Sequence, residues 1–293
     1  MTYDTILLRY GEIFLKGKNR AVFERKLAEN IHALTENAGL AKIKISKSQG
    51  RLLVPYFPEH KTLRRVFGLV SYSPAVRTEK NAEEIKRKAV ELLRGRPSHF
   101  VRDVPNGKKG TFRVTTRRSD KTFPITSVEF NRMVGQYIEQ ETDLEFSPNS
   151  PDVALEIEIN QEGAYLFFET IRCSGGLPTG VEGKVLLLIE NEASLLAGLL
   201  FMKRGCSVVP VAFTEKDISL LQAFSPAELK LYPLKEFSEL EELAVKKQIS
   251  ILVTGQVLGD KAAGKTNLTA MKPLVAYSKE QIQEQLKWYR SLV

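Results

Sequence analysis

The residues best suited to chemistry in this sequence are basic, and they form two groups in the first half of the chain. One group surrounds a single predicted strand and consists of Lys108, Lys109, Arg113, Arg117, Arg118 and Lys121. The other, Lys16, Lys18 and Arg20, lies in a predicted loop that enters a helix. Clustered cations of this kind bind phosphate groups. A solvated surface charge is the alternative for any one of them.

The distribution of charge along the chain favours a polyanionic partner. The net charge is +8, and residues 1–135 hold 28 Lys and Arg against 13 Asp and Glu. Residues 136–171 hold nine acidic and no basic side chains, and the remainder is nearly balanced. Such a concentration suits nucleic acid better than a small acidic metabolite. A surface rich in ion pairs, as in thermophilic proteins, is the alternative.

Metal ligands and nucleophiles are sparse. The two cysteines, Cys173 and Cys206, and the three histidines, His32, His60 and His99, are far apart in the sequence, so we expect no metal site. Cys206 falls in an apolar strand and Cys173 precedes a run of glycines. We therefore expect both to pack rather than react, and we assign no catalytic residue and no cofactor.

One segment of the second half matches a phosphate-binding pattern. Gly259 to Thr266 fits GxxxxGK[ST] and follows a predicted strand. A P-loop also needs a helix from this point, and Pro273 would interrupt that helix in its second turn. We expect no nucleotide here. The alternative is a nucleotide-dependent switch that uses Lys265.

The predicted elements around Lys16, Lys18 and Arg20 follow one another in the order of a ferredoxin-like fold. Helical periodicity follows a possible cap at Asn19 and ends at Gly39, and Ser48 to Gly50 form a predicted hairpin turn. The order β-α-β-β-α-β is predicted over strand 4–10, helix 19–38, strands 41–47 and 51–56, short helix 61–67 and strand 69–76.

A second region begins near Pro74. Asn81 with Glu84, and Thr126 with Glu129, have the spacing of helix caps. They predict helices over 82–93 and 127–140, with strands over 111–116, 153–160 and 164–171, and a linker over 174–183.

The last region predicts a parallel sheet. Apolar strands over 185–189, 207–213, 229–231 and 249–254 alternate with helices ending at Arg204 and over 235–247, and a helix over 279–292 follows. No apolar run approaches the about 20 residues of a membrane span, and the first ten residues carry no basic leader. We expect a cytoplasmic protein that does not contact the membrane.

Several motifs resemble one family. Arg9-Tyr10-Gly11-Glu12-Ile13 and Leu15-Lys16-Gly17-Lys18-Asn19-Arg20 resemble the opening signature of the tRNA 4-thiouridine synthetases, or tRNA sulfurtransferases. Phe123-Pro124 and Gly163-Ala164-Tyr165-Leu166-Phe167 resemble the THUMP domain of that family, and Gly175-Gly176-Leu177-Pro178 its linker. The resemblance continues at Thr254-Gly255.

This resemblance implies an α/β fold whose N-terminal half is α+β. The implied domains are a ferredoxin-like domain (1–73), a THUMP RNA-binding domain (74–173), a linker (174–183) and a PP-loop pyrophosphatase-like domain with a mostly parallel sheet (184–293). The first two domains of the family hold the acceptor region of tRNA, and the family also implies a homodimer. Because few aromatic residues lie near the cations, we expect recognition of RNA shape and backbone rather than stacked bases.

The resemblance fails at the nucleotide loop. The family needs an SGGxDS loop after the first strand of its last domain, because the glycines let backbone amides approach ATP. Here the place is taken by Ile189, Glu190, Asn191, Glu192, Ala193 and Ser194. Neither cysteine matches the family's nucleophile.

Two functions follow from these observations. The first is a tRNA-binding protein with a degenerate PP-loop that lacks its own ATP-dependent adenylation. The alternative is an active tRNA sulfurtransferase that makes 4-thiouridine with a rearranged site or with a sulfur-carrying or adenylating partner. A different THUMP-linked modification enzyme is disfavoured, because no zinc-deaminase ligand set and no methyl-donor loop is present.

Overall fold

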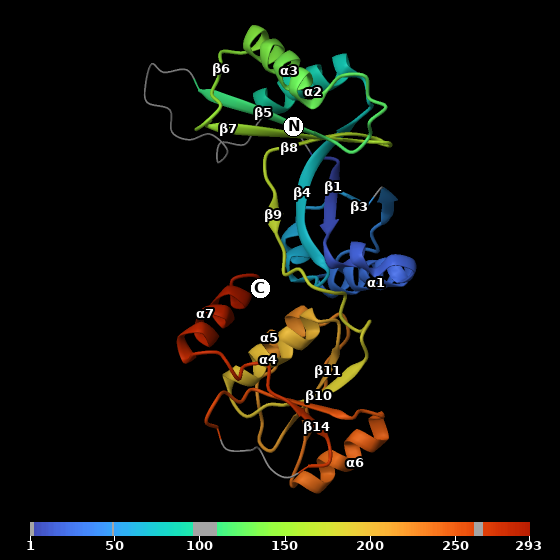
Figure 1. The fold of residues 1–293 in the computed structure, drawn as a ribbon, viewed down its shortest axis with the longest axis vertical. Coiled ribbons are helices and arrows are strands. Elements are labelled where there is room, and N and C mark those ends of the chain that lie inside the picture. Colours follow the sequence, from blue (N-terminus) through green and yellow to red (C-terminus); the bar gives the residue numbers. More distant parts are fainter. Residues whose placement is uncertain (1–2, 49, 96–109, 261–265) are drawn as a thin grey trace. The chain divides into compact units, whose positions relative to one another are not determined.

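The computed structural model describes residues 3–48, 50–95, 110–260 and 266–293 (Figure 1). Its chain divides into two compact units, which are described separately. The first unit comprises Met1–Arg9, Lys44–Pro58 and Ser71–Ile171, and the second comprises Tyr10–Ile43, Glu59–Val70 and Arg172–Val293.

The first unit is built on a mixed sheet. Within the described residues the sheet has nine strands in the order β2-β3-β1-β4-β8-β7-β5-β6, with β9 paired to β4. β5 runs parallel to β7, whereas β7 and β8 form an antiparallel pair across a tight turn. The strands are β1 (Thr5–Tyr10), β2 (Ser46–Ser48), β3 (Arg51–Pro55), β4 (Leu69–Thr78), β5 (Thr111–Arg118), β6 (Glu145–Phe146), β7 (Val153–Asn160), β8 (Gly163–Phe167) and β9 (Ile171–Arg172).

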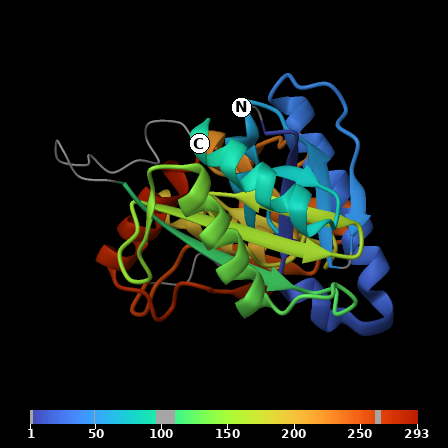
Figure 2. The same cartoon turned by 90° about the horizontal axis from the view of Figure 1, so that it is seen from above.

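Two helices cover one face of this sheet. α2 (Ala82–Arg94) and α3 (Ser127–Glu141) lie across the strands when the molecule is seen from above (Figure 2). The predicted caps are confirmed: the Asn81 side chain accepts from two backbone amides, and Thr126 with Glu129 forms a capping box. These caps fix where both helices begin.

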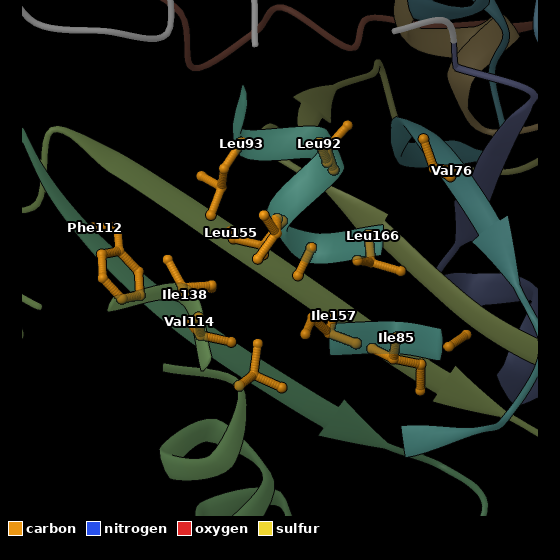
Figure 3. Close-up of a cluster of buried hydrophobic side chains, with 14 of the residues drawn as sticks. Val76, Ile85, Leu92, Leu93, Phe112, Val114, Ile138, Leu155, Ile157 and Leu166 are labelled. Carbon is orange, nitrogen blue, oxygen red and sulfur yellow. The ribbon is translucent and has the colours of Figure 1, made fainter. Parts of the chain in front are cut away.

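The core of the first unit lies between the helices and the sheet (Figure 3). Leu155 and Ile157 of β7 point into it together with Phe112 of β5 and Ile85 of α2, and all four are at most 1% exposed. Because side chains alternate along a strand, the intervening residues of β7 face the opposite side of the sheet. That side carries Glu156 and Glu158.

The second unit begins with a 3-10 helix that runs directly into an α-helix. η1 (Glu12–Asn19) contains Gly17 at φ 51°, and α1 (Arg20–Asn37) follows without a break. The predicted cap at Asn19 is wrong, because Asn19 itself has helical backbone angles and its side chain makes no capping hydrogen bond. The predicted stop at Gly39 is confirmed by its left-handed φ of 81°. The short helix η2 (His60–Arg65) also belongs to this unit.

The remainder of the second unit is an α/β fold. Its five described strands are all parallel and have the order β12-β11-β10-β13-β14. The chain leaves β10 toward β11 on one side and later returns as β13 on the other, so the strand order reverses at β10. Ligands of open α/β sheets bind beside the carboxyl ends of strands at such a point.

The elements of this fold follow the predicted alternation of strand and helix. The strands are β10 (Lys184–Leu188), β11 (Ser207–Ala212), β12 (Tyr232–Pro233), β13 (Ile251–Thr254) and β14 (Thr269–Met271). The helices are α4 (Glu192–Lys203), α5 (Ser219–Phe224), α6 (Phe237–Lys247) and α7 (Lys279–Arg290).

Three predicted strands are wrong in part. The strand expected over 164–171 ends at Phe167, as β8. The strand expected over 229–231 does not form, because the Leu229 amide donates to the Gln222 side chain at 2.7 Å, and the edge strand comes later, as β12. The strand expected over 41–47 is reduced to β2. None of the described helices combines the length and apolarity that a bilayer span requires.

Candidate functional site

The loop between β10 and α4 lies at the point where the strand order reverses. Asn191 caps α4, since its Oδ1 accepts from the Ala193 amide at 2.9 Å. The Glu190 amide donates to Ser194 Oγ at 3.1 Å, and Ser194 is fully buried. Ile189, the first residue after β10, is buried. The loop therefore uses amides of its own to fix its shape, and these amides do not point at a ligand.

Two carboxylates lie where a phosphate would approach this loop. Partial burial and the charge of Asp260 raise the pKa of the Glu190 carboxyl, against the opposing effect of Lys216. The Glu192 carboxylate pairs with Arg290 at 2.7 Å, and this hydrogen bond lowers the pKa of Glu192. A polyphosphate at this place would meet the Glu190 carboxylate, whose raised pKa means that Lys216 compensates its charge only in part.

A close backbone contact holds the loop from the side of β13. Gly255 follows β13 and is buried, and a Cβ atom there would collide with the backbone nitrogen of Ser194. Only glycine permits this approach. The loop after β10 is thus fixed by its own hydrogen bonds and by the chain that leaves the neighbouring strand.

A pocket of about 580 Å³ opens beside the loop. Its volume lies in the range of small-molecule sites. It combines apolar walls with two basic and two acidic side chains, and its lining consists of Ile189, Asn191, Glu192, Leu195, Lys216, Asp217, Ser219, Leu220, Arg290 and Val293.

The segment with the phosphate-binding pattern does not continue as a helix. Residues 261–265, including Lys265, lie outside the described residues. After Thr266 the chain enters the parallel strand β14 within three residues. The expected absence of a helix after this motif is confirmed for the part of the chain that the structure describes.

The basic residues around β5 differ in how far they are already engaged. The Arg117 side chain is 73% exposed and reaches Glu156 only at 4.0 Å, and Lys121 is exposed. Arg118, by contrast, donates to the Phe123 carbonyl at 2.6 Å. Arg113 donates to the Pro148 carbonyl at 3.2 Å. Arg117 and Lys121 are therefore the best placed of these cations to contact a phosphate.

Two further predicted cations, Lys108 and Lys109, lie outside the described residues.

A pocket of about 650 Å³ lies between β5 and α3 next to Arg113. Its lining consists of Arg113, Val114, Thr115, Val128, Asn131, Arg132, Gly135, Gln136, Glu139 and Phe146.

The N-terminal cations are only partly available. Lys16 pairs with Glu182 at 3.3 Å, and Arg20 donates to Glu24 at 2.8 Å. Lys18 is exposed, and no hydrogen bond or ion pair engages it within the described part of the chain. The sequence placed all three in one loop but did not distinguish the paired ones from Lys18.

Sequence reasoning missed a buried ion cluster on the sheet of the first unit. Glu158 is 7% exposed and accepts from Arg9 at 3.1 Å and from Arg51 at 2.9 Å. Arg9 lies in the predicted buried strand over 4–10. A charged residue in a buried strand usually has a side chain of opposite charge beside it, and this signal could have indicated the ion pair. The cluster removes two cations and one acid from the free surface.

The described residues contain no group of three His, Cys, Asp or Glu side chains that could hold a metal ion. Burial raises the pKa of the Cys173 thiol to about 12 and also raises the pKa of Cys206. Both thiols are therefore protonated at neutral pH, in contrast to reactive cysteines.

Comparison with known proteins finds two domains and several relatives. The ThiI ferredoxin-like domain matches residues 5–73, and the THUMP domain matches residues 79–169. A "Probable tRNA sulfurtransferase" of Brevibacillus brevis is 40% identical over 220 residues, covering 73% of this chain and 52% of the relative. One of Oceanobacillus iheyensis is 32% identical, covering 97% of this chain and 81% of the relative.

Solved structures with the same fold extend over the whole chain. PH1313 from Pyrococcus horikoshii superposes with a TM-score of 0.83 at 30% identity, covering 97% of this chain and 99% of its own. A 4-thiouridine synthetase in complex with RNA and ATP superposes with a TM-score of 0.78 at 24% identity, covering 99% and 86%. This chain spans only about half the length of the first curated relatives, 52% and 55%.

Proposed function

Because this chain belongs to the tRNA sulfurtransferase family, we propose that it binds tRNA and takes part in tRNA thiolation. The ATP-dependent step would occur at a rearranged site or on a partner protein. The chain is an α/β protein with a ferredoxin-like domain, a THUMP domain and a parallel five-stranded sheet. We propose domain limits of 1–73, 74–173 and 184–293, with a linker over 174–183.

The THUMP domain and its exposed cations support tRNA binding. Arg117 and Lys121 lie at the end of β5, inside the matched THUMP domain, and both are exposed. A structural neighbour with the same fold was solved with RNA. Because exposed cations near one strand exchange their counterions for phosphates, binding should depend steeply on salt. The proposed ligand is the acceptor region of tRNA.

The loop after β10 supports a rearranged or external ATP site. The observation that carries this part is the internal closure of the loop, in which Ser194 and Asn191 engage the amides of Glu190 and Ala193. Nucleotide phosphates are usually held by free amides of such loops. A carboxylate with a raised pKa, Glu190, lies beside them.

A narrower function remains a second proposal. The chain would bind tRNA as an accessory protein and would catalyse no sulfur transfer. The thiols favour this version, since burial raises the pKa of both Cys173 and Cys206. Family membership favours the thiolating version.

A thiolation assay separates the two versions. The purified chain is incubated with an unmodified tRNA transcript, ATP and a cysteine-derived sulfur donor, first alone and then with a cell extract that supplies a partner. Mass spectrometry of the digested RNA detects 4-thiouridine. Product that requires this chain supports thiolation, whereas tRNA binding without product in either condition supports the accessory function. The family also implies a homodimer, which we propose for this chain. Sedimentation of the same sample tests it.

A further inference from the structure

An exposed apolar surface lies on η1 of the second unit. The Phe14 side chain is 42% exposed and Leu15 is 86% exposed. Lys18 follows after a kink at Gly17, whose backbone angles are not helical, and is exposed as well. Single exposed apolar residues are ordinary, but an aromatic ring near an unpaired lysine is a feature of surfaces that bind RNA.

The exposed ring belongs to a stack of planar groups. Phe14 and Tyr10 have ring centroids 4.8 Å apart with an interplanar angle of 29°. The Arg20 guanidinium lies 4.6 Å from the Phe14 centroid. Glu24 and the Tyr10 hydroxyl accept from Arg20 at 2.8 and 2.9 Å, so the guanidinium is fixed in place. We call Tyr10, Phe14 and Arg20 the planar stack.

Ion pairs at other points of η1 hold this surface in place. Glu12 contacts Arg204 at 3.5 Å, and Lys16 contacts Glu182 at 3.3 Å, both within the second unit. The space around Gly17 is open, and its φ of 51° permits the turn that separates Lys16 from Lys18. The hydrogen bonds of Arg20 order the planar stack before a ligand arrives, which lowers the entropic cost of binding.

We propose that the planar stack binds one unpaired base of the tRNA, which stacks on Phe14 while Lys18 contacts an adjacent phosphate. This inference rests on the proposed tRNA binding. Unstacked bases bind to aromatic rings and to guanidinium planes. The proposed stacking replaces the expectation that the protein recognises the shape and backbone of RNA without stacking on its bases.

The charge around the planar stack favours RNA over a second copy of the chain. Residues 10–26 hold five basic and two acidic side chains. Two copies of this positive surface would repel each other, whereas a polyanion is attracted to it. The occupant is therefore an RNA segment with an unpaired nucleotide.

The test replaces the ring and keeps an apolar side chain. Filter binding compares the unaltered chain with Phe14→Leu on two probes, a tRNA transcript and a blunt-ended RNA duplex without unpaired nucleotides. Loss of one stacked base weakens binding about 5-fold or more. We expect this loss on the transcript, no loss on the duplex, and an unchanged salt slope, because no phosphate contact is removed.

Two controls accompany the substitution. Phe14→Tyr keeps an aromatic ring and should bind the transcript like the unaltered chain. Val245→Ala removes an 80% exposed apolar side chain from α6 and should change nothing. Circular dichroism checks that each variant is folded.

Equal affinity of Phe14→Leu and the unaltered chain for the transcript would overturn the inference, and so would an equal loss on both probes. A change in sedimentation without a change in RNA affinity would assign the surface to a second copy and would also overturn it. If the unaltered chain binds neither probe, the proposed tRNA binding itself fails and the inference fails with it. Binding of both probes with no Phe14 effect refutes only the inference.

Discussion

Arg9 Nη2 lies 3.1 Å from Glu158 Oε2, and neither side chain is more than 13% exposed. The two residues are 149 positions apart in the sequence, on β1 and β7 of the same sheet. Arg51 completes the cluster from β3, 2.9 Å from Glu158 Oε1. A single carboxylate thus joins three strands of the first unit.

Replacing this carboxylate should destabilise the fold. Glu158→Gln leaves two largely buried guanidinium groups without a counter-charge, so we expect a loss of about 3 kcal/mol in the free energy of unfolding. Urea denaturation followed by circular dichroism measures it. Glu156→Gln is the matched control, because its partner Arg117 is 73% exposed at 4.0 Å, and it should cost less than about 1 kcal/mol. Equal losses in the two variants would contradict this account.

The contact between β13 and the loop after β10 makes a second prediction. Gly255→Ala places a methyl group against the backbone of Ser194, and overpacking of this kind costs about 1 to 3 kcal/mol. Gly135→Ala in α3 meets open space and should be neutral or stabilising by up to about 1 kcal/mol. Thermal unfolding of both variants gives the comparison. A harmless Gly255→Ala would show that the loop is not held from β13.

The cations at and just after the end of β5 should control tRNA affinity. Neutralising Arg117, Arg118 and Lys121 together should weaken tRNA binding and reduce the slope of log affinity against log salt by about 2. Arg118 contributes little, because it already donates to the Phe123 carbonyl. Filter binding at several salt concentrations measures the slope, with Lys246→Ala on α6 as control. An affinity that does not respond to salt would exclude phosphate recognition.

The pKa of Glu190 predicts how stability depends on pH. Partial burial and Asp260 raise this pKa in the folded state, so folding favours the protonated carboxyl. At pH values below the pKa of Glu190 in the unfolded chain, the carboxyl is protonated in both states and does not affect stability. Its destabilising contribution appears as the pH rises through the pKa of Glu190 in the folded chain. Glu190→Gln should therefore stabilise the chain at pH 7, by less than about 1 kcal/mol, and have no effect near pH 3. Urea denaturation at both pH values tests this. A variant less stable at pH 7 would contradict the assigned cause.

The sequence predicted long, capped elements better than short ones. α2 and α3 were placed correctly because Asn81 and Thr126 are local signals that carry their own hydrogen bonds. β12 was misplaced and β14 was missed, because two or three residues give too short a pattern and depend on the neighbouring strand. The family was identified from its motifs, and the matched domains confirm it.

The sequence predicted which basic residues belong to the candidate site, but not which of them are exposed and which already bind another group of the protein. Arg117 and Arg118 are adjacent, and only the fold shows that one is exposed and the other engaged by a carbonyl. The planar stack was missed for the same reason, since Tyr10, Phe14 and Arg20 meet only once η1 and α1 have formed. Spacing alone does not encode such contacts when a 3-10 helix interrupts the α-helical period.

Calorimetric titration of ATP tests most directly whether the loop after β10 holds nucleotide phosphates. The unaltered chain, Glu190→Gln and Glu192→Gln are titrated with and without tRNA. We predict that neither substitution changes the heat of ATP addition, because under the proposed function the loop does not hold the nucleotide. ATP binding that becomes stronger in Glu190→Gln, where a carboxylate no longer repels the phosphates, would contradict the account.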